Sequence, residues 1–299
     1  MTDPDAPGGV GPVPAHVLAA FGLSGRQEPL PGGRGLAVRV DDTVLLPAPD
    51  AAASTWAGEV AERLRSPDVR MPGPRRSGDG RLVVDGWSAG EHVQGVDSPA
   101  GRWRELLAAA RSLHRALASE ARPAWLAGRH DPWADADRAA WGERAPRPGP
   151  VTAPLVARLQ GARRPLPEPL PDQLVHGDLT GNVLLPAHAG QGVPTVVDLS
   201  PYWRPAGAAV AVVVVDGLLW HGAGPDLVDL ADLGASGPQL LLRALLFRLL
   251  ALDALTHGRP ASAAAELPAH EAAARLVLAL PAAPGGRRPG PSSAGPGRG

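Results

Sequence analysis

The spacing of apolar residues divides the first third of the chain into short strands and one helix. Residues 36–46 alternate in a way that predicts two strands joined by a turn at Asp41 and Asp42, after a glycine-rich loop. Apolar side chains at helical spacing then predict a helix over residues 51–64, and residues 81–85 form another predicted strand. We therefore expect a small lobe of strands with one helix over residues 15–86.

Beyond Gly86 the pattern is mainly helical. A stripe of apolar residues with a 3.6-residue period predicts a helix over residues 101–119. Further predicted helices cover residues 135–143, 154–160 and 239–255, and short predicted strands cover residues 173–175, 183–185 and 195–199. A larger, mainly α-helical lobe is therefore expected over residues 87–280.

Both ends of the chain lack apolar periodicity. Residues 1–14 and 281–299 are rich in Pro and Gly, and we expect them to be unstructured. The N-terminal segment has no basic start followed by an apolar run, so it does not look like a signal peptide and favours the cytoplasm. The longest apolar stretch, residues 206–215, is too short to span a bilayer.

Composition removes several kinds of chemistry. The chain has 299 residues, of which 44% are hydrophobic, enough to bury a sizeable core and to form two lobes. A formal net charge of -1 gives no overall attraction to nucleic acid or to an anionic membrane, so small molecules are the expected partners. There is no Cys, and all 29 basic residues are Arg, which excludes disulfides, thiolate metal sites and lysine Schiff bases.

One segment carries the residue types that phosphoryl transfer needs. Residues 176–182 read His-Gly-Asp-Leu-Thr-Gly-Asn, and a later apolar strand ends at Asp198. In phosphoryl transfer the protein mainly positions groups and neutralises charge, with an Asp accepting the hydroxyl proton and oxygen ligands holding magnesium. Asp178 is the candidate base, and Asn182 and Asp198 are the candidate oxygen ligands.

Together these residues resemble the catalytic loop and metal-binding segment of aminoglycoside phosphotransferases and choline kinases, distant relatives of the protein kinases. The resemblance covers roughly residues 15–255 and looks like a bacterial branch whose members mostly lack an assigned substrate. It rests further on Leu-Pro-Gly-Gly-Arg-Gly at residues 30–35, the helix with Trp56, Val-Asp-Gly-Trp at 84–87, Arg-Pro-Ala-Trp-Leu at 122–126, Asp-Pro-Trp at 131–133, and Asp-Leu-Ser-Pro-Tyr-Trp-Arg-Pro at 198–205.

This resemblance implies an α+β, two-lobed, protein-kinase-like fold with a small β-rich N-lobe and a larger α-helical C-lobe. It implies ATP and Mg2+ as cofactors and transfer of phosphate to a hydroxyl of a small polar molecule. It also makes Asp178 the catalytic base beside His176, with Asn182 and Asp198 as magnesium ligands. The implied nucleotide contacts are Gly32, Gly33 and Gly35 over the phosphates, and Asp85 and Trp87 on an adenine hinge at residues 84–89.

Two positions depart from the family pattern. Asn182 follows Asp178 by four residues, whereas the family loop has five. The strand that ends in a phosphate-binding lysine in the family has Leu46 at that position. Glu59, on the following helix, then either pairs with a cation that binds phosphate or belongs to a solvated helix face.

Arg39 is the candidate substitute for the missing lysine. If the turn at residues 41–42 has two residues, Arg39 pairs with Val44 and lies diagonally across from Leu46 on the same side of the sheet. The long side chain of Arg39 would then reach the phosphates. A longer turn would instead direct Arg39 to solvent.

Several other side chains have a structural interpretation. His176 organises its loop by hydrogen bonding more readily than it touches substrate, and His114 suits a helix interior. Asp216, which follows four valines, needs a partner such as Arg204 if it is buried.

The leading hypothesis for function is an ATP- and magnesium-dependent phosphotransferase. The alternative is a catalytically weak or inactive kinase-fold protein that binds a ligand or partner, and Leu46 favours this alternative. A metal-dependent hydrolase using Asp178 and Asp198 is disfavoured, because the His and Asp clusters of such enzymes are missing from the sequence. The predicted helical lobe also contains the acidic residues Asp131, Asp135 and Asp137. These residues either attract a cationic acceptor or belong to a solvated helix face.

Overall fold

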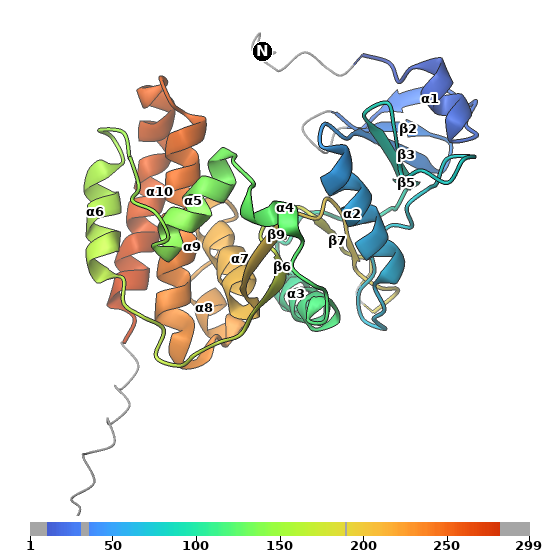
Figure 1. The fold of residues 1–299 in the computed structure, drawn as a ribbon. Coiled ribbons are helices and arrows are strands. Elements are labelled where there is room, and N and C mark those ends of the chain that lie inside the picture. Colours follow the sequence, from blue (N-terminus) through green and yellow to red (C-terminus); the bar gives the residue numbers. More distant parts are fainter. Residues whose placement is uncertain (1–10, 31–35, 189, 282–299) are drawn as a thin grey trace, which may run out of the picture. The chain divides into compact units, whose positions relative to one another are not determined.

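The computed structural model describes residues 11–30, 36–188 and 190–281, and the chain divides into two compact units (Figure 1). The first unit combines Met1–Arg129 with Asp172–Val213. The second combines His130–Pro171 with Val214–Gly299. Helix α7 (Ala206–Trp220) continues from the first unit into the second.

A five-stranded antiparallel sheet opens the first unit. Its strands lie in the order β1 (Gln27–Pro29), β2 (Val38–Val40), β3 (Thr43–Pro47), β5 (Trp87–Glu91) and β4 (Val83–Val84). The predicted two-residue turn between β2 and β3 is confirmed by the pairs Val40 with Thr43, Arg39 with Val44, and Val38 with Leu45. Asp41 in this turn has a φ of 54°, a left-handed conformation that Asp tolerates better than most residues.

Residues before position 15 take part in the fold, and the sheet extends beyond residue 86, which the sequence pattern does not indicate. The side chain of Gln27 accepts the backbone N–H of Val13 and donates to its carbonyl, and Val13 is buried. The expectation that residues 1–14 are all unstructured is therefore wrong at Val13. Strand β5 carries the sheet to Glu91, past the lobe boundary that we predicted at residue 86. Residues 1–10 and 282–299 lie outside the described part of the chain.

One face of the sheet is buried beneath α1 (Ala15–Ala20). The apolar cluster between them contains Val13, Val17, Leu18, Phe21, Leu23, Val38, Val40, Leu45, Val84, Trp87 and Ala89. Full burial of an aliphatic side chain contributes about 1.5–3 kcal/mol, so this cluster decides which face of the sheet points inward. Because side chains alternate along a strand, Arg39, Val44 and Leu46 lie on the opposite, less buried face.

The helices predicted after the strands are confirmed. Helix α2 (Ala51–Arg63) begins at Asp50, whose side chain accepts the N–H of Ala53 and so caps the helix. Helix α3 (Trp103–Leu117) buries the predicted apolar stripe, and the short α4 (Ala124–Ala127) follows it.

Two small antiparallel ribbons complete the first unit. Strand β6 (Asp172–His176) pairs with β9 (Pro201–Pro205), and β7 (Val183–Leu184) pairs with β8 (Thr195–Val196). Strand β9 was not predicted, because Pro at both of its ends is a signal against a strand. The strand predicted over residues 195–199 stops at Val196, where the chain turns toward Asp198.

The second unit is a group of helices packed around α9 (Gly237–Leu255), which is buried over most of its length (Figure 1). Its neighbours are α5 (Pro132–Trp141), α6 (Ala153–Ala162) and α10 (Pro260–Ala279). Helix α8 (Asp226–Ala231) and a 3₁₀ turn at Gly234–Ser236 connect α7 to α9. The three helices predicted here are confirmed, with ends shifted by a few residues. Among the described residues, no helix is both long and apolar enough to cross a membrane.

Asp216 of α7 and Arg248 of α9 form a buried ion pair. Nε of Arg248 donates to Oδ1 of Asp216 and Nη2 donates to Oδ2, each at 2.6 Å. Only 1% of Asp216 and 6% of Arg248 are exposed. The sequence called for a partner such as Arg204, whereas the packing of the helices supplies Arg248.

We expect Arg248→Met to lower the free energy of unfolding by about 3–5 kcal/mol, because the Asp216 carboxylate then stays buried without this guanidinium. The double variant Asp216→Leu/Arg248→Met should lose less, since replacing a buried pair by apolar side chains of similar size is often neutral. Urea titrations followed by circular dichroism measure both. A double variant less stable than Arg248→Met would contradict this expectation.

Candidate active site

Backbone hydrogen bonds join the loop of residues 177–182 to the segment of residues 197–200. These bonds run from the N–H of Gly177 to the carbonyl of Ser200 and from the N–H of Val197 to the carbonyl of Asn182, each at 2.9 Å. They extend the pairing of β6 with β9 and of β7 with β8 on either side of residue 198. The three motif residues with candidate roles therefore lie on two segments that are bonded to each other.

His176 is fully buried and bonds to both segments. Its Nδ1 accepts the N–H of Asp178 at 3.1 Å, so the neutral ring carries its proton on Nε2. Nε2 lies 3.4 Å from the carbonyl of Val197 and donates to it. One ring nitrogen thus holds the loop, and the other holds the residue before Asp198. These contacts are of the loop-organising kind that the sequence suggested for this side chain.

Asn182 turns back onto Asp178 in spite of the shortened spacing. Its Nδ2 donates to the carbonyl of Asp178 at 2.7 Å and lies 3.4 Å from Oδ2 of the same residue. Gly181 has a φ of 85°, a left-handed conformation that glycine adopts without strain, and it brings the chain round. With the NH2 group directed at Asp178, the Oδ1 atom of Asn182 is the one suited to a cation.

Asp198 is exposed and has a φ of 49°. This left-handed conformation, shared with Asp41, is one that Asp adopts more readily than most residues. The carboxylate of Asp198 and the amide oxygen of Asn182 are hard oxygen donors of the kind that magnesium prefers. In the described part of the chain, no three His, Cys, Asp or Glu side chains gather as a metal site.

Gly177 is required by an aromatic ring on the neighbouring strand. A Cβ at this position would lie 2.3 Å from Cδ2 of Tyr202, closer than any packing permits. Arg129 holds that ring in turn, with its guanidinium carbon 5.1 Å from the ring centroid and Nη1 donating to the carbonyl of Pro201. This support cannot be read from the sequence, because Gly177, Tyr202 and Arg129 lie on three separate segments of the chain.

The candidate phosphate contacts on the sheet are only partly described. Gly32, Gly33 and Gly35 lie outside the described residues. Arg39 lies on the same face as Leu46, as expected for a two-residue turn, and its Nε donates to the carbonyl of Asp41 at 2.7 Å. The side chain of Leu46 is among the most exposed large apolar groups, with 36% of the residue accessible.

The structure places Asp85 and Trp87 within the sheet, so the expectation of a connecting hinge at residues 84–89 is wrong. Val84 pairs with Trp87 across a two-residue turn in which Asp85 and Gly86 both have positive φ. Asp-Gly between apolar residues is a strong hairpin signal, and it sets the local structure here. The Asp85 carboxylate contacts His16 at 2.6 Å, and Trp87 is part of the core beneath α1.

Residues 92–102 provide the connection between the sheet and α3 instead. Within it, Val96 and Leu185 exchange backbone hydrogen bonds of 2.8 and 2.9 Å. A Cβ at Gly95 would lie 2.7 Å from Cβ of Leu184, so this segment runs directly against the end of β7. The connection from the sheet is thereby joined to the strand that follows the candidate catalytic loop.

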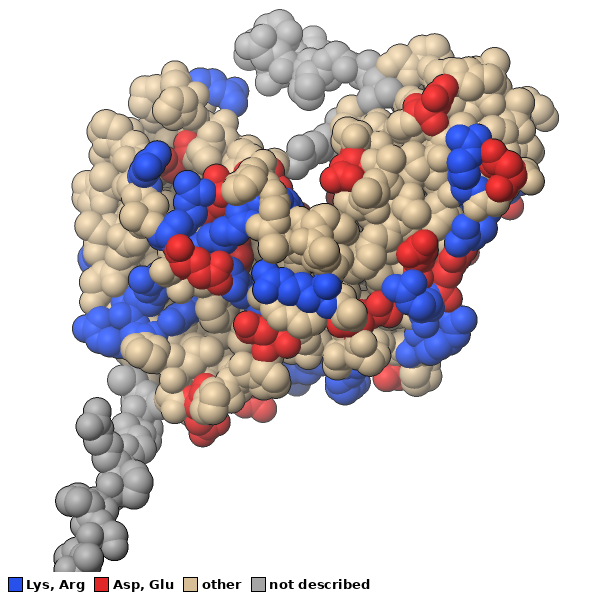
Figure 2. All heavy atoms as spheres, viewed as in Figure 1, with Lys and Arg blue, Asp and Glu red and all other residues tan. Residues whose placement is uncertain are grey.

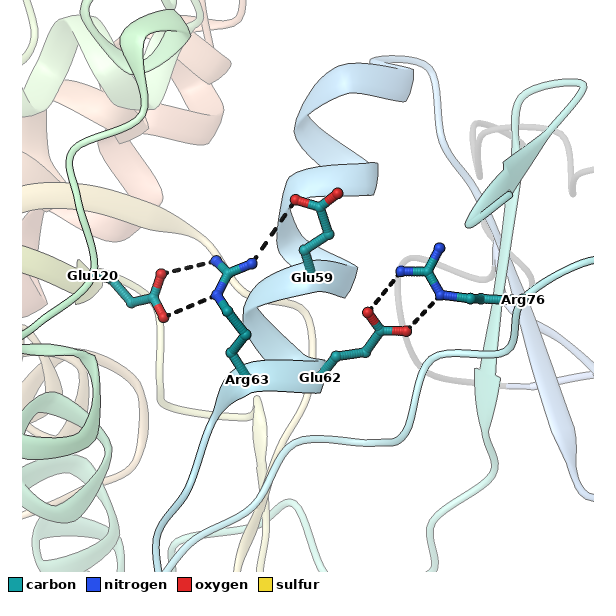
Figure 3. Close-up of polar contacts among 5 residues, drawn as sticks. All are labelled: Glu59, Glu62, Arg63, Arg76 and Glu120. Carbon is teal, nitrogen blue, oxygen red and sulfur yellow. Dashed lines mark hydrogen bonds and ion pairs between the residues drawn. The ribbon is translucent and has the colours of Figure 1, made fainter. Parts of the chain in front are cut away.

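Arginines hold α2 from two sides (Figure 3). Arg63 forms a two-bond ion pair with Glu120, which lies beyond α3, and approaches Glu59 one turn back at 3.9 Å. Arg76 forms a similar pair with Glu62, and this hydrogen-bonded guanidinium lowers the pKa of the Glu62 carboxyl. Glu59 therefore shares Arg63 on an exposed helix face, which agrees with the structural interpretation of this residue.

The acids considered for a cationic acceptor have local partners. Asp131 caps α5 by accepting the N–H groups of Trp133 and Ala134. Asp135 is paired with Arg138 and with Arg144. On the face shown in Figure 2, basic and acidic side chains are interspersed. Asp131 and Asp135 are thus explained by the structure of α5.

Comparisons of sequence find no relative: no protein-family model matches the chain, and no curated protein matches it. Comparison of structures does find neighbours. One is a choline/ethanolamine kinase family protein from Mesorhizobium loti, with 19% identity, a TM-score of 0.55, and coverage of 85% of this chain and 94% of that one.

Two aminoglycoside phosphotransferases are similarly close. The one from Alicyclobacillus acidocaldarius has 12% identity and a TM-score of 0.57, over 90% of this chain and 95% of that one. A thermostable variant of APH(4)-Ia, in ternary complex with AMP-PNP and hygromycin B, has 17% identity and a TM-score of 0.56, over 89% and 98%. The chain therefore has the α+β, protein-kinase-like fold of the aminoglycoside phosphotransferases and choline kinases.

Proposed function

We propose that this protein is a magnesium-dependent phosphotransferase that uses ATP and acts on a hydroxyl of a small polar molecule. The observation that carries this proposal is the association of Asp178, Asn182 and Asp198 on two hydrogen-bonded segments. The fold supports it, since its neighbours include kinases, and one of them binds AMP-PNP and hygromycin B.

Each motif residue has a distinct part in this reaction. Asp178 accepts the proton of the acceptor hydroxyl as that oxygen bonds to the γ-phosphorus, while the bond from this phosphorus to the bridging oxygen breaks and ADP leaves. The Oδ1 atom of Asn182 and the carboxylate of Asp198 hold magnesium, which when bound neutralises charge on the phosphate oxygens. His176 keeps the base and the ligand-bearing segment in register through its two ring nitrogens.

Nucleotide contacts on the sheet are the less conventional part of the proposal. Residues 92–97, where the chain leaves β5, replace residues 84–89 as the segment that we place beside the nucleobase. Arg39 supplies a cation on the face that carries Leu46. The Nε atom of Arg39 bonds to its own turn, so phosphate binding requires this flexible side chain to reorient.

A binding protein with a kinase fold is the second candidate. The observation in its favour is Leu46 at the position where related kinases carry a lysine, in a chain that contains no lysine. Turnover separates the two functions, because only the first predicts efficient transfer of phosphate, and absence of any MgATP effect on thermal melting would favour the second.

Asp178→Asn should lower the rate of phosphate transfer by about two to four orders of magnitude, the usual effect of losing a positioned general base. Asn keeps the size of the side chain, so stability and ATP affinity should change little. Product formation from labelled ATP, screened over small polar alcohols, measures the parent and the variant. Asp229→Asn, an exposed acid on α8, is the matched control. A variant that transfers phosphate at the parental rate would reject Asp178 as the base.

Asp198→Asn should weaken magnesium-dependent ATP binding by roughly ten- to a hundredfold, because a charged oxygen ligand is lost. Asn tolerates the left-handed backbone at this position, so the change isolates the charge. Thermal melting measures the effect: at a hundred times its Kd, MgATP stabilises a protein by about 2.7 kcal/mol. The parent should gain stability with MgATP and lose this gain in EDTA. An equal MgATP effect in the variant would exclude Asp198 as a ligand.

Arg39→Ala should weaken ATP binding by roughly ten- to a hundredfold, since a charged hydrogen bond to phosphate contributes about 1.5–3 kcal/mol. Adding Leu46→Lys to this variant should restore much of the affinity, because the two positions share a face of the sheet. Calorimetric titration with ATP over the double-mutant cycle measures both effects. Arg26→Ala, another exposed arginine of the first unit, is the control. Full ATP affinity in Arg39→Ala would remove this residue from the nucleotide site.

A further inference from the structure

A histidine, rather than another strand, bonds the outer edge of β6 at its last residue. Strand β6 pairs with β9, and alternate N–H groups of an antiparallel strand point away from the partner. The N–H of His176 is one of these, and it donates to Nε2 of His114 in α3 at 3.2 Å. Near the other end of β6, Nε2 of Gln173 donates to the carbonyl of His114 at 2.6 Å. One residue of α3 therefore holds β6 at two points.

This contact requires His114 to be neutral. Because Nε2 accepts a hydrogen bond, the proton of the ring must be on Nδ1. Burial, followed by the influence of nearby His176, lowers the pKa of His114 to about 3, so the ring stays neutral at ordinary pH. The backbone of Ala110, one turn back in α3, acts in the opposite direction on the pKa of His114, and its effect is smaller than that of burial. A leucine could fill this buried volume, but it has no polar atom. The imidazole differs from it by offering Nε2 as an acceptor for the N–H of His176.

The contact between His114 and His176 is linked to Asp178 and Asp198 through the ring of His176. The N–H of His176 is held by His114, and the ring of His176 bonds to the N–H of Asp178 and the carbonyl of Val197. A side chain can hold its partners in place only if its own backbone is fixed. His114 therefore bonds to the backbone that carries the His176 ring, and that ring bonds to Asp178 and to the residue before Asp198.

We propose that His114 is a positioning residue of the active site, which acts through His176 to set the places of Asp178 and Asp198. This inference rests on the proposed function for its catalytic meaning. The alternative is that His114 is a core residue whose only effect is on stability.

Two substitutions separate these roles. His114→Leu keeps an apolar side chain in place and leaves the N–H of His176 without its acceptor. His114→Gln retains an oxygen acceptor at a similar reach. Leu107→Val, at a buried position on the same helix, is the control for a general loss of stability.

The primary measurement is amide hydrogen exchange in the full-length protein, which is independent of activity. A general loss of stability lowers protection throughout the protein, and Leu107→Val measures that effect. In His114→Leu, protection of the His176 and Asp178 amides should fall at least tenfold further than this general effect explains. In His114→Gln it should stay within about threefold of the parent. In the parent, ¹⁵N spectra of labelled histidines should show the Nδ1–H tautomer for His114 and the Nε2–H tautomer for His176.

Kinetics then test the catalytic meaning. His114→Leu should lower kcat by roughly ten- to a hundredfold with less than a threefold change in KM for ATP, since small displacements of reacting groups affect the chemical step. His114→Gln should recover most of kcat.

The possible outcomes are distinguishable. Unchanged local protection in His114→Leu, or a cationic or Nε2–H His114 in the parent, overturns the positioning role. A kcat loss in His114→Leu no larger than in Leu107→Val also overturns it. If the parent transfers no phosphate to any acceptor, the proposed function fails, and the exchange and tautomer results alone decide whether His114 positions the loop.

Discussion

A buried imidazole holds the candidate site together. His176 accepts a hydrogen bond from the backbone of Asp178 with one ring nitrogen and donates to Val197 with the other, so two segments about twenty residues apart in sequence are bonded to one rigid ring. A neutral imidazole can play both parts only in one tautomer. The fold meets this condition because it buries the ring, places the N–H of Asp178 at one ring nitrogen, and places the carbonyl of Val197 at the other.

Few specific side chains are needed to hold the two segments in this arrangement. Backbone pairing of β6 with β9 and of β7 with β8 brings the segments together, and such pairing accepts many sequences. Two positions are less tolerant. Gly177 has no room for a Cβ beside Tyr202, and Gly181 supplies the left-handed turn that lets Asn182 reach Asp178 over a shortened loop. The site thus depends on close packing around the backbone as much as on the acids themselves.

A chain without lysine uses arginine for every long cationic side chain, and this affects how its elements are held. The planar guanidinium forms two parallel bonds to a carboxylate, as between Arg63 and Glu120, Arg76 and Glu62, and Arg248 and Asp216. The first two pairs are partly exposed, and each contributes little energy. The third is buried, and its geometry must compensate for the desolvation of both charges. Leu46 is left as an apolar side chain on the face that carries Arg39.

The amino-acid sequence by itself determined the features whose causes are local. A two-residue turn sets the register of β2 and β3, apolar periodicity sets α2 and α3, and a short loop with a glycine brings Asn182 to Asp178. Only the tertiary structure decided that Arg248 meets Asp216, that Trp87 lies in the core, that residues 201–205 form a strand, and that His114 bonds to His176. Those outcomes depend on contacts between segments far apart in the chain, and the free energy of such a contact is set by which surfaces pack together, a quantity that no short stretch of sequence contains.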